Sequence, residues 1–415
     1  MDTLTLLPLA LATLLYAVVS RRAFGTLVSV PLAFLVLGLL LGDLGFGLTD
    51  LPVSGEALNV LAEVTLVLTL FADASSIDVK RLRRQHALPV RLLGIGLPLT
   101  VAAGLGVALL LLPGLSLLEA ALVAIILAPT DAALGQAVVT NRYVPERVRR
   151  ALNVESGLND GLVFPALLIV ASIVIAGTVS DGARSALGWS GFVLAQVVLG
   201  PLAGYLVGRF GGTLIERAIE RDQVSAGFLR LSTIALPLVA YGGAELVSGN
   251  GFLAAFTCGL TVGTTARALR TGIEDFAEAE GQLLSLFVFF ALGAVLLPAV
   301  WPQMQWQHAL YALLSLTLIR MVPVAVSLTG LGLERGTIAF IGWFGPRGLA
   351  SVIYLLLLTD DYRMDAIDQI GAVVLLTVAF SIVLHGLSAH PLAARYGATH
   401  RDGDSGGDSE DGGRV

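Results

Sequence analysis

Residues 151–177 read ALNVESGLNDGLVFPALLIVASIVIAG, an apolar run long enough to cross a bilayer, with two carboxylates near its start. An ionisable side chain at membrane depth costs several kcal/mol, so Glu155 and Asp160 are too costly to serve packing alone. In a helix Ser156 lies on the same face as Asp160, because residues four apart stack. Asn159 stacks on Glu155 in the same way. We therefore predict a cluster of oxygen ligands, the kind that hard cations prefer.

The composition places this run in a membrane protein. Of the 415 residues, 56% are hydrophobic and 13% are charged, whereas a soluble domain has about 25% charged residues. This excludes an ordinary water-soluble enzyme, a nucleic-acid-binding protein and a disordered scaffold. The single cysteine, Cys258, excludes an internal disulfide and a cysteine metal cluster, and we expect no bound cofactor.

Apolar runs separated by turn or charge signals predict an all-α polytopic protein with about 13 transmembrane helices. The first seven runs are Thr3–Ser20, Leu27–Gly42, Ala57–Ala74, Leu92–Leu112, Leu117–Val139, Ala151–Gly177 and Gly191–Gly208. The other six are Leu231–Val247, Phe252–Gly263, Gln282–Ala299, Ala309–Thr329, Gly336–Leu358 and Ile367–His385. Together they form one membrane domain over residues 1–396. Residues 397–415 are rich in Gly, Ser and Asp, so we expect an acidic, disordered cytoplasmic tail.

The basic residues give these spans a direction. If the N-terminus is outside, all but four of the 25 Lys and Arg residues fall on the cytoplasmic side, which basic residues favour. Arg184 and Arg363 lie on the outer side, and Arg320 and Arg347 lie inside spans. We therefore expect a multi-pass protein of the cell membrane with its N-terminus outside and its C-terminus in the cytoplasm.

Two spans are interrupted near their middle. The fifth carries Ala128-Pro129-Thr130-Asp131, and the twelfth carries Gly345-Pro346-Arg347-Gly348. Proline removes a backbone donor, so both helices should break and free backbone groups for an ion. With six spans on either side of the seventh, each broken span is the fifth of its half, which indicates inverted repeats. Asp131 would neutralise the positive ends of the broken helices, and Arg347 the negative ends.

Arg320, in the eleventh span, is a second cation at membrane depth and needs a carboxylate partner. Glu155 and Asp160 both fit, and if one of them holds Arg320 the other stays free to exchange ions. The remaining acids of the spans are less central or lie near span ends, and these are Glu63, Glu245, Asp73 and Glu119.

With these residues the chain resembles the sodium/proton exchanger family of monovalent cation/proton antiporters, in its prokaryotic NhaP-like branch. The matching stretches occur in order over essentially the whole membrane region. They are Ala128-Pro129-Thr130-Asp131, Glu155-Ser156 with Asn159-Asp160, Leu318-Ile319-Arg320, Gly345-Pro346-Arg347-Gly348 and Asp78-Val79-Lys80-Arg81-Leu82-Arg83-Arg84.

The resemblance implies a homodimer of inverted-repeat subunits in which the two broken helices, spans 5 and 12, cross. Spans 4–6 and 11–13 would form a core bundle, and the remaining spans would form a dimerisation scaffold. The partners implied are the lipid bilayer, a monovalent cation and the proton.

The resemblance also implies a role for each site residue. Asp160 would bind cation and proton in turn, and Glu155 with Arg320 would form a structural ion pair. The cation would lie against Asp160, Ser156 and Thr130, with Asp131 and Asn159 also at the site. In the family an Asn-Asp pair goes with electroneutral one-for-one exchange.

One stretch departs from the family pattern. After Phe71 many relatives carry an acidic residue and a glycine, whereas this chain has Ala72-Asp73-Ala74-Ser75. We therefore assign no ligand role to Asp73.

Three other classes of function compete with an antiporter. A cation channel could use the same acids, but two matched broken helices favour a carrier. A proton-coupled transporter of a small organic anion would bind a carboxylate at the broken helix N-termini, where Asp131 argues against it. The motifs of intramembrane hydrolases are absent, and the five histidines fall near span ends or in loops. The sequence predicts a secondary antiporter, not an enzyme, that exchanges Na⁺, or else Li⁺ or K⁺, for H⁺.

Overall fold

The computed structural model describes residues 29–48, 56–77, 87–139, 141, 143–178, 186–266, 283–361 and 366–404, with scattered residues between 10 and 18. Every regular element in these ranges is helical. The expected first span lies largely outside them, as do Arg184, Arg363 and the basic stretch that begins at Asp78.

Eight of the described helices are long and apolar enough to cross a membrane, and four shorter apolar helices accompany them. The elements of the first half are α2 (Val30–Leu41), α3 (Glu56–Ser76), α5 (Ala87–Arg91), the π-turn η1 (Leu92–Gly96), α6 (Leu97–Leu111), α7 (Leu117–Ile126), α8 (Ala132–Val139) and α9 (Glu146–Thr178). Those that follow are α10 (Ala186–Glu220), α11 (Ala226–Leu246), α12 (Gly251–Thr265), η2 (Leu292–Leu296), α14 (Leu297–Val300), η3 (Trp301–Gln303), α15 (Trp306–Leu316), α16 (Leu318–Ser327), α17 (Arg335–Trp343), α18 (Leu349–Asp361) and α19 (Ile367–Asp404).

The fifth and twelfth expected spans are each divided into two helices. The fifth consists of α7 and α8, which are separated by residues 127–131, and the twelfth consists of α17 and α18, which are separated by residues 344–348. Each gap contains the proline that the sequence marked, where the missing N–H cannot continue the helical ladder. The expected spans from the second to the thirteenth all coincide with described helical segments, and the total of thirteen stays a prediction.

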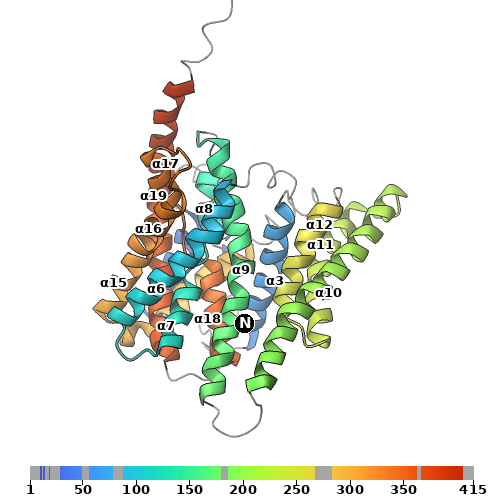
Figure 1. Cartoon of the computed structure of the whole chain (residues 1–415), viewed down its shortest axis with the longest axis horizontal. Coiled ribbons are helices and arrows are strands. Elements are labelled where there is room, and N and C mark those ends of the chain that lie inside the picture. The colour runs from blue at the N-terminus through green and yellow to red at the C-terminus, as the bar shows by residue number, and fades with distance from the viewer. Residues whose placement is uncertain are drawn as a thin grey trace, which may run out of the picture.

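The helices pack in two groups with α9 between them (Figure 1). On one side α10, α11 and α12 pack on one another and on α3; on the other, α15 to α19 pack with α6 and α7. Helix α9 contacts α3, α10 and α12 as well as α7 and α8. The carboxylate-bearing stretch of α9 therefore lies where the two groups meet.

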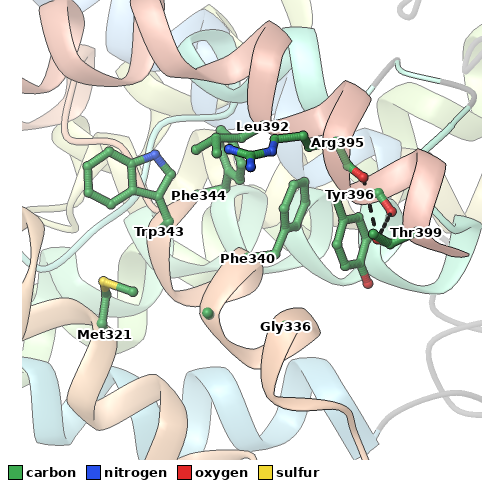
Figure 2. Close-up of a pocket in the computed structure, with 10 residues that line it drawn as sticks. Met321, Gly336, Phe340, Trp343, Phe344, Leu392, Arg395, Tyr396 and Thr399 are labelled. Carbon is green, nitrogen blue, oxygen red and sulfur yellow. Dashed lines mark hydrogen bonds between the residues drawn. The ribbon is translucent and has the colours of Figure 1, made fainter.

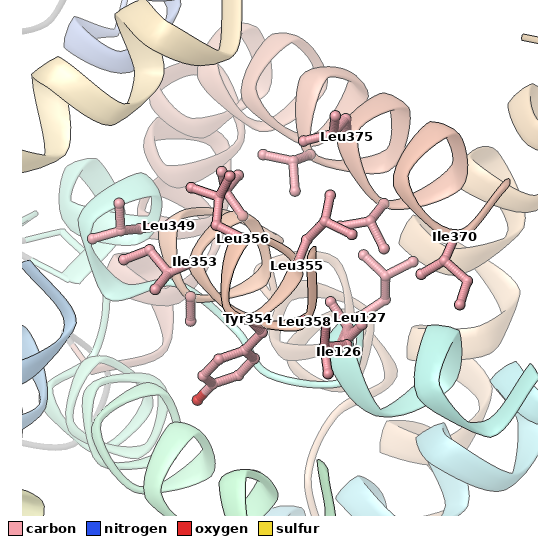
Figure 3. Packing of buried hydrophobic residues seen from close by; sticks show 14 of the residues in the cluster. Ile126, Leu127, Leu349, Ile353, Tyr354, Leu355, Leu356, Leu358, Ile370 and Leu375 are labelled. Carbon is pink, nitrogen blue, oxygen red and sulfur yellow. The ribbon is translucent and has the colours of Figure 1, made fainter. Parts of the chain in front are cut away.

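Helix α18 is buried on every side along most of its length. Residues 349–356 are all buried, and Figure 3 shows side chains of α18 in one apolar cluster with Ile126 of α7 and with Ile370 and Leu375 of α19. A helix that is apolar all round belongs in an interior. This packing fixes the start of α18, next to the gap at 344–348, against the end of α7.

The C-terminal helix is longer than the sequence indicated. Helix α19 continues past His385 to Asp404 and so includes residues 397–404, which were expected to be part of a disordered tail. Pro391 lies within it, and buried Ala389, Ala393 and Tyr396 pack it on its neighbours beyond the apolar run. Tertiary packing thus extends a helix that composition alone would end. Residues 405–415 lie outside the described ranges.

Candidate functional site

The two interrupted stretches contact each other directly. The Asp131 backbone N–H donates to the Pro346 carbonyl at 2.8 Å. On the α18 side of the contact, the Ser351 hydroxyl donates to the carbonyl of Ile126, the last residue of α7, at 2.8 Å. Backbone groups freed by one break are therefore satisfied by the other, as buried polar groups at membrane depth require.

Asp131 caps two helix N-termini with one carboxylate. Its Oδ1 accepts from the Leu134 backbone N–H at 3.3 Å, in the first turn of α8. Its Oδ2 accepts from the Leu349 backbone N–H at 2.6 Å, at the start of α18. A negative charge is stabilised at positive helix ends, and the Asp131 carboxylate lies at two of them.

Arg347 supplies the complementary positive charge. Its side chain is fully buried, and its Nη1 donates to the carbonyls of Ala128 at 2.6 Å and Pro129 at 3.0 Å. These carbonyls lie just past the C-terminal end of α7, where a helix is electronegative. The Nε and Nη2 atoms of Arg347 have no hydrogen-bond partner among the described residues.

Two glycines allow these groups to approach so closely. A Cβ at Gly348 would overlap Oδ2 of Asp131, and a Cβ at Gly345 would overlap the guanidinium of Arg320. Both positions lie in the gap between α17 and α18. In the Gly-Pro-Arg-Gly stretch the proline therefore breaks the helix, and the two glycines leave room for charged side chains against the backbone.

Glu155 and Arg320 form a bidentate ion pair in the interior. The two N···O distances are 2.5 and 2.8 Å, and both side chains are almost completely buried. The pair joins α9 to α16. It also decides between the two carboxylates that the sequence left open as partners of Arg320.

Three polar side chains, two from α9 and one from the first gap, form a small network. The Thr130 and Ser156 hydroxyl oxygens are 3.0 Å apart, and the Asn159 amide donates to the Thr130 hydroxyl at 2.7 Å. All three side chains are buried. The Oδ1 atom of Asn159 has no partner among the described residues, so this amide retains an unused acceptor.

Asp160 is the carboxylate that this network does not neutralise. Its Oδ1 is buried without a hydrogen-bond partner in the described part of the chain, and the Tyr354 hydroxyl donates to its backbone carbonyl at 3.1 Å. The residue as a whole is only partly buried. Asp160 thus combines a buried, unused acceptor with some access to solvent, which suits a group that exchanges its ligand.

Asp73 belongs to this site, although the sequence analysis set it aside as a span-end residue. It lies on α3, and a Cβ at Gly157 would touch the Asp73 carbonyl oxygen at 3.5 Å and its Cβ at 3.7 Å. The packing of α3 on α9 thus places Asp73 beside the turn of α9 that carries Ser156 and Asp160, and the spacing of Asp73 in the sequence gave no sign of this.

Two of the remaining acids cap helices away from the site. The Glu245 carboxylate accepts from the Gly251 backbone N–H at 2.9 Å, at the start of α12. Glu119 forms a reciprocal capping box with Ser116 at the start of α7. Both are ordinary uses of a carboxylate at a helix N-terminus.

His385 holds the two sides of the second gap together. Its Nε2 lies 2.9 Å from the carbonyl of Trp343, the last residue of α17. Its Nδ1 lies 3.2 Å from the Ser381 hydroxyl, which accepts from the Arg347 backbone N–H at 2.7 Å. His385 is buried within α19, and this helix continues past the expected end of the span to Asp404.

The donor set of the site is made of oxygen atoms. No three His, Cys, Asp or Glu side chains in the described ranges are placed to hold a metal ion together. Carboxylate, hydroxyl and amide oxygens suit a hard cation that is held weakly and released.

Comparisons with known proteins agree on one family. A family model described as "Sodium/hydrogen exchanger, transmembrane" matches residues 9–395. Over 376 residues the chain is 26% identical to a K(+)/H(+) antiporter, NhaP, of Alkalimonas amylolytica, an alignment that covers 87% of this chain and 61% of that protein. Over 337 residues it is 23% identical to a Na(+)/H(+) antiporter of Saccharomyces cerevisiae, covering 76% and 33%.

Solved structures show the same fold. The sodium proton antiporter MjNhaP1 from Methanocaldococcus jannaschii, at pH 8, superposes with a TM-score of 0.70 at 21% identity, covering 94% of this chain and 97% of the other. An electron-microscopy map of the same antiporter gives a TM-score of 0.71 at 21% identity. The chain spans about 60% of the length of the curated bacterial relatives that it matches.

Proposed function

Because the chain belongs to the sodium/hydrogen exchanger family, we propose that it is a secondary antiporter that exchanges a monovalent cation for H⁺. Na⁺ is the first candidate, and Li⁺ and K⁺ are the next. The observation that carries the proposal is the Asp160 carboxylate, which has a buried and unused oxygen and lies one helical turn from Ser156, whose hydroxyl contacts that of Thr130. The fold places this carboxylate in a membrane-spanning helix, where an unpaired charge is too costly without a function.

The proposed mechanism is competition for one carboxylate. In its ionised form Asp160 accepts a partly dehydrated cation, with further oxygens from Thr130, Ser156 and water. A proton on the same carboxylate removes its charge and expels the cation. Only an occupied site is charge-neutral, so only an occupied site crosses between the two faces, which couples the two flows and makes the exchange electroneutral.

The Glu155 and Asp131 carboxylates each have partners within the protein, which supports Asp160 as the carboxylate that binds the transported ion. The Glu155 carboxylate is committed to Arg320 through two hydrogen bonds. The Asp131 carboxylate is committed to the N-termini of α8 and α18. Asp160 has no such partner in the described ranges, so its charge is the one that a transported ion would balance.

The proposal extends to the whole molecule. Spans 4–6 and 11–13 form the moving core bundle, and the other spans form the scaffold through which two copies associate in the cell membrane. Large apolar side chains on α10 and α11 support the scaffold role, because Phe210, Leu214 and Phe228 are each about 70% exposed and such a surface belongs against lipid or another subunit. The N-terminus is outside and the C-terminus is cytoplasmic.

The test is proton flux in proteoliposomes that contain a pH-sensitive dye, with Na⁺, K⁺ and Li⁺ added in turn. The wild-type protein should dissipate a pH gradient on addition of its cation, without net current. Asp160→Asn should lose this activity while remaining folded. Asp368→Asn is the matched control, because Asp368 is exposed and, within the described ranges, its carboxylate hydrogen-bonds Gln303 away from the site. Full exchange by the Asp160 variant would refute the proposal, and a current far above carrier rates would identify a channel.

A further inference from the structure

A cavity lies away from the carboxylates of the transport site, between α16, α17 and α19. It has a volume of about 470 Å³, and its walls include Phe340, Trp343, Phe344, Leu392 and Tyr396. Figure 2 shows these aromatic side chains around the cavity, with the Arg395 side chain lying over it. The walls are held in place by packing, since the rings of Phe340 and Tyr396 stack at 4.2 Å.

One end of this pocket lies at the depth of the transport site. Trp343 ends α17, and Met321 directly follows Arg320 of the buried ion pair. A Cβ at Gly342 would contact Met321 at 3.4 Å, so α16 and α17 are in close contact there. On α16, Val322, which follows the pocket-lining Met321, and Val326 are more than half exposed. These apolar side chains belong against the hydrocarbon of the bilayer.

The other end of the pocket lies at the depth of lipid headgroups. Ser381 hydrogen-bonds Arg347 at the gap in span twelve, and such gaps lie near the bilayer midplane. Arg395 is fourteen residues farther along α19, or roughly 21 Å at the rise of an α-helix. The hydrocarbon ends about 15 Å from the midplane and the headgroups follow. The pocket thus spans the depths of an acyl chain and of a phosphate.

Arg395 carries a charge that the described residues leave unused. Its side chain is exposed, and it makes no hydrogen bond or ion pair with another residue in the described ranges. Arg335 and Glu334, which precede Gly336 of the pocket wall, are also exposed, and their charges offset each other. The charge of Arg395 above apolar walls complements an anionic headgroup with a hydrocarbon tail. The chain's own residues 405–415, SGGDSEDGGRV, are too polar to fill such walls.

We propose that the pocket between α16, α17 and α19 binds one anionic phospholipid, with its phosphate at Arg395 and an acyl chain along Trp343 and Met321. The proposal does not depend on which cation is exchanged at Asp160. A lipid at this position would contact both α17 and α19, the two helices that His385 joins at the gap.

Trp343 provides the probe, because it lines the pocket. The other three tryptophans are removed by W189F, W301F and W306F, and the protein is reconstituted in phosphatidylcholine with increasing amounts of lipid brominated on the acyl chains. Brominated phosphatidylglycerol should quench Trp343 at about a fivefold lower mole fraction than brominated phosphatidylcholine, the preference that one arginine gives. Arg395→Gln should abolish that preference, and Ala339→Phe, which fills the pocket, should reduce quenching by both lipids.

Arg230→Gln is the matched control, since Arg230 is an exposed arginine on α11 away from the pocket, and it should retain the preference. Equal quenching by the two lipids, or a preference that survives Arg395→Gln, would overturn the proposal. Loss of quenching on addition of millimolar inorganic phosphate would do so too, because it would indicate an anion site without a lipid tail. If neither lipid quenches Trp343, the pocket does not bind a lipid, and its occupant would be a peptide or a second copy of the chain.

Discussion

At the scale of single residues, the Glu155–Arg320 pair is the contact most sensitive to change. Both charges are buried and joined by two short hydrogen bonds. Removing one partner leaves the other charge buried and uncompensated, which typically costs about 3–5 kcal/mol. We therefore expect Glu155→Gln and Arg320→Gln each to lower the midpoint of thermal unfolding in detergent markedly.

Replacing both charges tests whether the single variants lose stability because they leave one buried charge unpaired. The double variant Glu155→Leu with Arg320→Met removes both buried charges and should recover much of the lost stability. Glu146→Gln is the control, because Glu146 pairs with Arg150 one helical turn away on an exposed surface, where such pairs contribute about 0.3–0.5 kcal/mol. An equal loss of stability in Glu146→Gln and Glu155→Gln would contradict this account.

Asp131 is a second residue whose replacement should lower the stability of the protein. Asp131→Asn keeps an acceptor oxygen but removes the charge that faces the N-termini of α8 and α18. The expected loss is about 1–2 kcal/mol, because each helix end contributes about 0.3–1 kcal/mol. Asp131→Ala should lose more, since it leaves the Leu349 N–H unpaired. Unfolding in denaturant would measure both losses, and equal stability of the three proteins would show that Asp131 caps neither helix.

The sequence could predict those site residues that carry a charge within an apolar span. Asp160, Glu155 and Arg320 lie within long apolar runs, so their charge alone predicts a function. Asp73 could not be recognised in this way, because its distance from the site depends on how α3 packs against Gly157 of α9. The choice between Glu155 and Asp160 as partner of Arg320 likewise depends on the rotation of α9, which helical spacing does not determine.

At the scale of elements, the gap between α17 and α18 depends on glycine. A Cβ at Gly348 would overlap the Asp131 carboxylate, and Asp131 cannot yield without losing the α18 cap. Gly348→Ala should therefore cost about 1–3 kcal/mol, as overpacking does, and reduce exchange in proteoliposomes more than tenfold.

Gly106 of α6 provides the matched control. A Cβ at Gly106 meets nothing within 4 Å, and alanine favours a helix over glycine by about 0.5–1 kcal/mol. Gly106→Ala should thus leave stability unchanged or slightly raised, with normal exchange. If Gly348→Ala behaves in the same way, the close approach of the two broken spans is not required.

The breaks themselves could be predicted because Pro129 and Pro346 act through local backbone chemistry. Helix lengths could not be predicted as well. Helix α10 includes polar residues up to Glu220, beyond the apolar run that ends at Gly208. Helix α19 likewise continues to Asp404, past the apolar run that ends at His385. Hydropathy detects the part of a helix in hydrocarbon, whereas a helix continues into water wherever neighbours pack on it.

At the scale of the whole molecule, the distribution of basic residues predicts which loops face the cytoplasm. Asp43 follows the second span and Gln223 follows the seventh, and both are exposed. In a Cys258→Ala background, Asp43→Cys should react with an impermeant maleimide only from outside the cell. Gln223→Cys and Ala398→Cys should react only in inverted vesicles. Labelling of Asp43→Cys and Ala398→Cys from the same side would contradict the predicted orientation.

The account of transport rests on one carboxylate that holds either a proton or a cation. The most direct test is proton release when the cation is added to purified protein in weakly buffered solution. We predict that Na⁺, or whichever cation is exchanged, releases up to one proton per subunit, with an apparent affinity that falls as the pH is lowered, and that Asp160→Asn releases none. Cation binding without proton release, or the same release from Asp160→Asn, would contradict the account.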